Sequence, residues 1–138
     1  MTGYLLDTNT ISADLKLDQR VTRKLAILNK EEKKVVFTTI NYFEIKRGLL
    51  AANATRKLKV FDNMCQQYKI LGIDDRRVLD KASEIYADLK RRGELIPDTD
   101  ILIGAVALHH DLIVVTNDDH FQRIHDIQLE NWINDHST

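Results

Sequence analysis

Short apolar, β-branched runs alternate along the chain with longer segments of helical spacing. The runs cover Tyr4–Leu6, Val35–Thr38, Ile70–Ile73 and Leu112–Val115, and a weaker one includes Ile127 and Leu129. Near-continuous apolar runs are typical of strands that are buried on both faces of a parallel sheet. The four stronger runs therefore predict parallel strands, and the weaker run predicts a last, short strand.

The segments between these runs carry helical periodicity. Four apolar residues recur at i, i+4, i+7 and i+11, namely Val78, Ala82, Ile85 and Leu89, which predicts an amphipathic helix. Further helical faces are predicted by Val21, Leu25 and Leu28, and by Phe43 and Leu50. Residues 101–108 are apolar almost all round, which predicts a buried helix. Alternating strands and helices predict an α/β fold with a central, mostly parallel β-sheet flanked by helices.

Acidic residues follow three of the predicted strands and begin the apolar helix. Asp7 ends the first strand, and Glu44 lies in the helix after the second. Asp100 falls in the first turn of the apolar helix, and Asp118 follows the fourth strand. Ligands of an open parallel sheet bind beyond the carboxyl ends of its strands. We therefore expect these carboxylates, from four separate segments, to meet at one edge of the sheet.

Each acid also has an interpretation that needs only local structure. Asp7 could cap the helix that follows it, and Asp98 could cap the helix that begins after Pro97. Asn41 and Glu44 could form a capping box, and Asp118 and Asp119 could simply belong to a turn. Local capping does not require convergence, whereas the predicted layout brings all four acids to one place.

Composition limits the remaining possibilities. The 138 residues, 43% hydrophobic and 30% charged, predict one globular domain spanning 1–138. No stretch approaches the roughly 18 apolar residues of a membrane span, and no signal peptide is evident. The single cysteine, Cys65, allows no internal disulfide, which favours a cytoplasmic protein. A net charge of -1 argues against a nucleic-acid partner unless the two signs are sorted onto different faces.

A cluster of carboxylates favours a hard cation. Two carboxylates about 4 Å apart repel by about 4 kcal/mol at a protein-surface dielectric, so the cluster must bind protons or metal ions. Mg²⁺ and Mn²⁺ prefer oxygen ligands. Zinc is disfavoured because the five histidines show no spacing of a closed zinc site and Cys65 has no cysteine partner. His109 and His110 instead suit the C-terminal end of a helix.

The order Asp7, Glu44, Asp100, Asp118 in a small α/β chain resembles the PIN domain, and more narrowly the VapC toxins of bacterial toxin–antitoxin pairs. The stretches that carry the resemblance are "LLDTN", "FEIKRGL", "IPDTDILIGAVAL" and "VVTNDDHF", which together span nearly the whole chain. The resemblance implies an endoribonuclease that depends on Mg²⁺ or Mn²⁺, in which a metal-activated water hydrolyses an RNA phosphodiester bond.

The same resemblance implies roles for individual residues. The catalytic, metal-binding acids would be Asp7, Glu44, Asp100 and the more variable fourth acid Asp118. Supporting residues would be Asn9 and Thr116, with Asp119 an alternative fourth acid and Asp98 an extra acid beside Asp100. Lys46 and Arg47 are candidates for contacts with RNA phosphates. The implied partners are a cognate VapB-like antitoxin, the RNA substrate and a second copy in a homodimer, with no membrane.

Two other readings stay open on the sequence alone. Haloacid-dehalogenase-like phosphatases also place an Asp after the first strand, as a covalent nucleophile. Their second acid would fall at Asn9 and the following glycine at Thr10, which counts against them. The other reading is a housekeeping or non-catalytic PIN module, although an unused charge cluster would cost stability.

Overall fold

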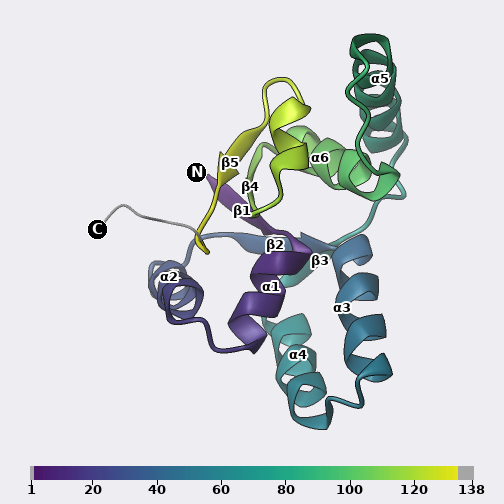
Figure 1. The fold of residues 1–138 in the computed structure, drawn as a ribbon. Coiled ribbons are helices and arrows are strands. Elements are labelled where there is room, and N and C mark those ends of the chain that lie inside the picture. Colours follow the sequence, from purple (N-terminus) through teal and green to yellow (C-terminus); the bar gives the residue numbers. More distant parts are fainter. Residues whose placement is uncertain (1, 134–138) are drawn as a thin grey trace.

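The computed structural model describes residues 2–133 and shows a five-stranded parallel sheet with helices on both faces (Figure 1). In chain order the elements are β1 (Gly3–Leu6), α1 (Thr8–Leu15), α2 (Gln19–Lys30), β2 (Val35–Thr38), α3 (Thr39–Ala51), α4 (Thr55–Gln67), β3 (Lys69–Leu71), α5 (Arg76–Arg92), α6 (Asp98–His110), β4 (Leu112–Val115), the 3-10 helix η1 (Asp119–Arg123) and β5 (Gln128–Glu130). The expected α/β fold class is confirmed.

The strand order places the first strand at the centre of the sheet. The order is β3-β2-β1-β4-β5, so β1 pairs with β2 on one side and with β4 on the other. Leu6 at the end of β1 lies opposite Val115 at the end of β4. Since all pairs are parallel, the segments that follow β1, β2 and β4 leave the sheet at the same edge.

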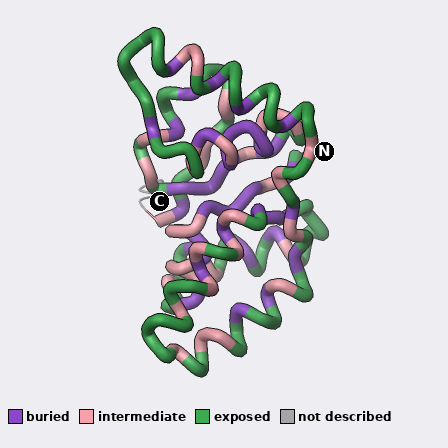
Figure 2. Tube along the Cα trace, turned by 90° about the vertical axis from the view of Figure 1, so that its right-hand side faces the viewer, coloured by how far each residue is buried: buried purple, intermediate pink, exposed green. Residues whose placement is uncertain are grey.

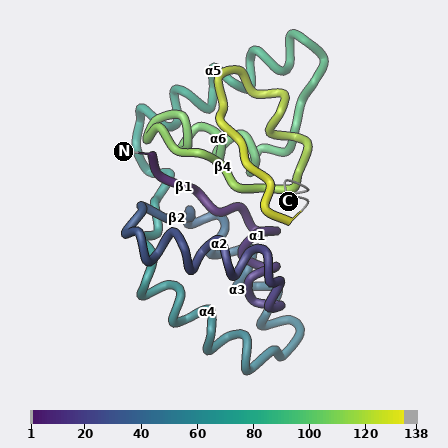
Figure 3. Tube along the Cα trace, turned by 90° about the vertical axis from the view of Figure 1, so that its left-hand side faces the viewer, coloured from purple at the N-terminus to yellow at the C-terminus, as the bar shows by residue number. Residues whose placement is uncertain are grey.

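Helices α1 to α4 cover one face of the sheet, and α5 and α6 cover the other (Figures 1 and 3). Strand residues alternate between the two faces: Leu5 packs in the cluster with α5 and α6, whereas Leu6 packs in the cluster with α1 to α4. Buried positions follow the strands through the middle of the molecule (Figure 2). This double burial explains why the strands of the sequence are apolar throughout.

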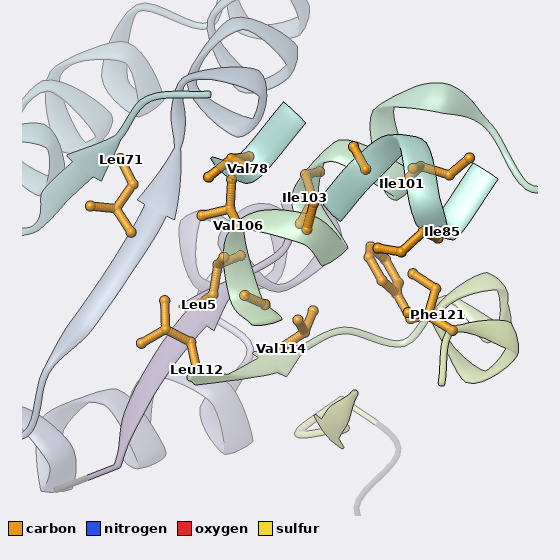
Figure 4. Packing of buried hydrophobic residues seen from close by; sticks show 14 of the residues in the cluster. Leu5, Leu71, Val78, Ile85, Ile101, Ile103, Val106, Leu112, Val114 and Phe121 are labelled. Carbon is orange, nitrogen blue, oxygen red and sulfur yellow. The ribbon is translucent and has the colours of Figure 1, made fainter. Parts of the chain in front are cut away.

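The α5–α6 side of the core holds α6 firmly against the sheet (Figure 4). The four apolar positions predicted to face the core from α5 are all buried. Ile103 and Val106 of α6 are fully buried above Leu5 and Val114. Although α6 is apolar almost all round, neither it nor any other helix within residues 2–133 is long and apolar enough to cross a membrane.

Some local expectations were wrong. Phe43 and Leu50 are 59% and 55% exposed, and α3 instead buries Asn41 and Ile45. The guanidinium carbon of Arg47 lies over the ring of Phe43, 5.0 Å from the centroid of that ring. The third strand begins at Lys69 and ends at Leu71, before Gly72 and Ile73, and helix α4 was not anticipated.

Candidate active site

Asp7 is the first residue after β1 and stands at the N-cap position of α1, but its side chain makes no capping hydrogen bond. The side chain is buried and accepts hydrogen bonds from three polar groups instead. Thr116 Oγ1 donates at 2.8 Å, and the side-chain amides of Asn9 and Asn41 each donate at 3.3 Å. The simple capping interpretation is therefore wrong, because this carboxylate is held by residues from three separate segments.

The environment of Asp7 disfavours its charge. Burial raises the pKa of Asp7 from 3.8 to about 6, although the Thr116 hydrogen bond acts in the opposite direction. The negative charges of Asp100 and Asp118 act in the same direction as burial and contribute to this raised pKa. A bound cation would relieve both penalties.

Glu44 is held by a short chain of hydrogen bonds that begins at Asn41. The Asn41 amide donates to Thr8 Oγ1 at 3.0 Å, and Thr8 Oγ1 donates to Glu44 Oε1 at 2.7 Å. The expected Asn41–Glu44 capping box is wrong, because Thr38 is the N-cap of α3 and forms a capping box with Asn41. Asn41 thus fixes the start of α3 and also supports both Asp7 and Glu44.

Asp100 lies in the first turn of α6 and is partly buried. Burial raises its pKa, the hydrogen bond with His120 lowers it, and the charges of Asp118 and Glu44 raise it. Asp98 is not the N-cap of this helix, since Pro97 occupies that position without a side-chain hydrogen bond. Asp98 is exposed and lines a hollow between α5 and α6, so the two neighbouring acids lie in different surroundings.

Asp118 combines a capping role with a place in the acidic cluster. Its Oδ1 accepts from the backbone N–H of His120 at 2.9 Å, which caps η1. The same oxygen lies 3.1 Å from His120 Nδ1, and that ring nitrogen lies 3.0 Å from Asp100 Oδ2. Asp119 is exposed, so Asp118 is the better candidate for the fourth acid.

The sheet topology thus places the four acidic residues at one edge of the sheet, beyond the carboxyl ends of β1, β2 and β4 and at the start of α6. Within residues 2–133, one donor atom each from Asp100, Asp118 and His120 lies within 4.8 Å of the others, a spacing suited to a metal ion. A donor set dominated by carboxylate oxygens fits a hard divalent cation. The catalytic and metal-binding roles of these acids stay predictions.

The remaining candidates differ in position. Asn9 and Thr116 lie beside Asp7, and the Asn9 amide also donates to Thr116 at 3.2 Å. Arg47 lies 4.0 Å from Glu44 with its side chain 61% exposed, whereas Lys46 pairs with Asp62 of α4 at 3.4 Å. Arg47 is therefore nearer the acids than Lys46.

Three polar residues at this site were missed from the sequence, namely Thr8, Asn41 as a support of the acids, and His120. Thr8 directly follows Asp7, and His120 lies two residues after Asp118, so proximity to the predicted acids was the available signal. Their hydrogen bonds depend on side-chain directions that a sequence pattern does not give.

Fold and site together define an α/β protein with an acidic site at the carboxyl edge of a parallel sheet. The family model of the PIN domain matches residues 4–127. The chain belongs to the PIN domain family.

Similar proteins cover nearly the whole chain. It is 28% identical over 135 residues to ribonuclease VapC2 of Haemophilus influenzae, covering 96% of this chain and 100% of that protein. It is also 28% identical over 134 residues to the tRNA(fMet)-specific endonuclease VapC of Salmonella typhimurium, covering 96% and 99% of the two chains. Among solved structures, DNA-bound VapBC of Salmonella typhimurium is similar with a TM-score of 0.84 and 25% identity, covering 96% and 99%. The structure of FitAcB of Neisseria gonorrhoeae is similar with a TM-score of 0.77 and 29% identity. The match covers 93% of this chain and 96% of that one.

Proposed function

We propose that this chain is the toxin of a type II toxin–antitoxin pair and a metal-dependent endoribonuclease. The observation that carries the proposal is that four acidic residues from separate segments follow β1, β2 and β4 or begin α6, at the carboxyl edge of the sheet. Relatives named ribonuclease VapC and tRNA(fMet)-specific endonuclease support RNA as the substrate. The complexes named VapBC among the structural neighbours support an antitoxin partner.

The residues that would hold Mg²⁺ or Mn²⁺ are Asp7, Glu44, Asp100 and Asp118. Such an ion lowers the pKa of a bound water and screens the scissile phosphate. Asp7 is the fixed anchor of this set, since Asn41 and Thr116 determine the direction of its carboxylate.

Two of these acids, Asp100 and Asp118, would also orient the attacking water. Asp100 and Asp118 are only partly buried, so their carboxylate oxygens can accept hydrogen bonds from that water and receive its proton. Thr8 keeps Glu44 turned toward the same edge. Arg47 would contact an RNA phosphate beside the acids, whereas Lys46 would first have to leave Asp62.

The partner would be a small VapB-like antitoxin. A hollow of about 130 Å³ lies between α1, α3 and α4, and Thr8 and Glu44 form part of its lining together with apolar Leu15, Ile45 and Leu49. Apolar side chains of an amphipathic antitoxin segment would enter this hollow, and a basic side chain from the segment would pair with the acids. The proposal also includes a homodimer, which the family resemblance implies, and a cytoplasmic location, which the single cysteine favours.

The phosphatase alternative is not favoured. Asn9, where that class needs its second acid, donates hydrogen bonds to Asp7 and Thr116, so an uncharged amide contributes to this position. The match to the PIN domain agrees with this reading.

The decisive experiment is an RNA cleavage assay on the protein purified away from its partner. Cleavage is expected with Mg²⁺ or Mn²⁺, is expected to stop with a chelator, and should leave 5′-phosphate and 3′-hydroxyl ends. Cyclic phosphate ends would show attack by the ribose 2′-hydroxyl and would overturn the metal-water mechanism.

A matched pair of variants tests the assignment of the acids. Asp100→Asn should abolish cleavage, whereas Asp98→Asn, two residues away on the same helix turn, should leave it nearly unchanged. Equal effects of the two substitutions would contradict the site.

A further inference from the structure

The imidazole of His120 lies beside two acids of the cluster, Asp100 and Asp118. Its Nδ1 lies 3.0 Å from Asp100 Oδ2 and 3.1 Å from Asp118 Oδ1. The imidazole therefore faces two of the proposed metal-binding acids at once. Its side chain is 40% exposed, so the outer part of the ring remains open to solvent.

The backbone and the core fix the position of this ring. The N–H of His120 donates to Asp118 Oδ1, which ties the residue to the start of η1. The next residue, Phe121, is fully buried in the core beneath α6. An imidazole anchored in this way presents Nδ1 to the acids without a large loss of side-chain freedom on binding an ion.

The separations between donor atoms match those of metal ligands. In octahedral coordination at about 2.1 Å, adjacent ligand atoms lie about 3 Å apart. The two distances from His120 Nδ1 to the carboxylates have this value. One donor atom from each of the three residues also lies within 4.8 Å of the others.

Hydrogen bonding by His120 would satisfy these three groups less well than a bound metal ion would. The Nδ1 atom carries a single proton or a single lone pair, so one proton would be shared between two carboxylates. An ion held among the three groups would instead contact all of them and would screen the repulsion between Asp100 and Asp118.

We propose that His120 is a metal ligand of this site through Nδ1, an inference that rests on the proposed function. It changes the expected donor set from carboxylates alone to carboxylates and one imidazole. Because imidazole suits transition metals and Mg²⁺ is selective for oxygen, His120 favours Mn²⁺ over Mg²⁺ at this site.

Pulsed electron paramagnetic resonance of Mn²⁺ bound to the full, RNA-free protein tests this contact directly. Wild type is expected to show the hyperfine coupling of a coordinated ¹⁴N nucleus. Labelling the protein with ¹⁵N-histidine should convert this signal to that of ¹⁵N without changing the sequence. Bound Mn²⁺ without nitrogen coupling would overturn the proposal while leaving the carboxylate metal site intact.

Calorimetric titrations provide the second measurement. His120→Gln should weaken Mn²⁺ binding by about tenfold or more, the scale on which loss of metal-site partners acts, and should change Mg²⁺ binding less. The matched control is His125→Gln, because the His125 imidazole lies 3.6 Å from Asp88 of α5, which is not one of the proposed metal-binding acids. That control should keep both affinities and the nitrogen coupling.

The outcomes separate the two proposals. Equal weakening of Mn²⁺ and Mg²⁺ by His120→Gln would overturn the selectivity claimed for the imidazole. Failure of wild type to bind either ion at millimolar concentration would overturn the metal site of the proposed function as well as the role of His120.

Discussion

Asp7 carries the largest electrostatic cost among the acids of the site. It is buried, its pKa is raised to about 6, and its three side-chain hydrogen bonds do not cancel the effect of burial. A carboxylate kept in such surroundings is suited to cation binding rather than to stabilising the metal-free fold.

Replacing Asp7 with Asn keeps the shape of the side chain and removes its charge. We expect Asp7→Asn to lower RNA cleavage by at least about 100-fold, judging from the effect of losing groups that support a metal. The free energy of unfolding of the metal-free protein at pH 8 should be unchanged or higher, by at most about 3 kcal/mol for a pKa shift of about two units. Chemical denaturation and the cleavage assay check this, with the exposed Asp98→Asn as control. A large loss of stability would contradict it.

The raised pKa of Asp7 also predicts a pH dependence of stability. The folded-state pKa of about 6 exceeds the ordinary 3.8, so the folded state binds the proton more tightly than the unfolded state. The destabilisation by ionised Asp7 is therefore complete above pH 6 and is lost as the pH falls from 6 toward 4. In chelator, the stability difference between wild type and Asp7→Asn should shrink over this range. A difference that stays constant with pH would refute this assignment.

At the scale of elements, the sequence predicted those whose burial leaves a clear pattern. The strands β1, β2 and β4 could be predicted because neighbouring residues of each strand are buried on opposite faces of the sheet, as Leu5 and Leu6 are in β1. This leaves an unbroken apolar run in the sequence. Helix α5 was found from its four buried positions. Helix α4 was missed because only Phe61 and Met64 of its thirteen residues are buried, which leaves a mostly polar segment.

The site could be predicted only in part for a related reason. Strand order and the carboxyl-edge rule were enough to expect Asp7, Glu44, Asp100 and Asp118 together. The contacts of Asn41 and His120 with those acids depend on side-chain rotamers and on helix starts, which the pattern of apolar residues does not determine.

The end of α5 provides a test of backbone conformation. Gly93 is the C-cap residue of α5 with φ +68°, a left-handed conformation that disfavours side chains. Gly93→Ala should lower the free energy of unfolding by about 1 kcal/mol, because an L-residue is strained there. Gly48→Ala is the matched control: Gly48 lies inside α3 with open space around it, so Ala should stabilise the fold by about 0.5–1 kcal/mol. Denaturant unfolding should show that the two substitutions change the free energy of unfolding in opposite directions. Changes in the same direction would contradict this prediction.

At the scale of the whole molecule, the site joins the two halves of the core. Asp7 and Thr116 are 109 residues apart, yet they share a hydrogen bond because β1 and β4 are neighbours. Glu44 comes from α3 on one face of the sheet and Asp100 from α6 on the other. An ion held by these acids would therefore stabilise the packing of both layers against the sheet.

Metal binding should then appear as a rise in thermal stability. An ion at 100 times its dissociation constant adds about 2.7 kcal/mol to the free energy of unfolding. For a chain of this size we expect an increase in Tm of several degrees with Mn²⁺. Asp100→Asn should remove most of this increase, whereas Asp98→Asn should keep it, as scanning calorimetry would show. A similar increase in both variants would place the ion elsewhere.

The position of β4 between β1 and β5 has a consequence for the time at which toxicity arises during synthesis. The carboxylates at positions 7 and 44 leave the ribosome early, but β4 and Asp118 are translated much later. Before residue 112 is added, β1 lacks one of its two neighbours, and Thr116, which fixes Asp7, is absent. If the proposed function holds, a nascent chain would be inert toward the RNA around it until β4 and the segment carrying Thr116 and Asp118 have been made.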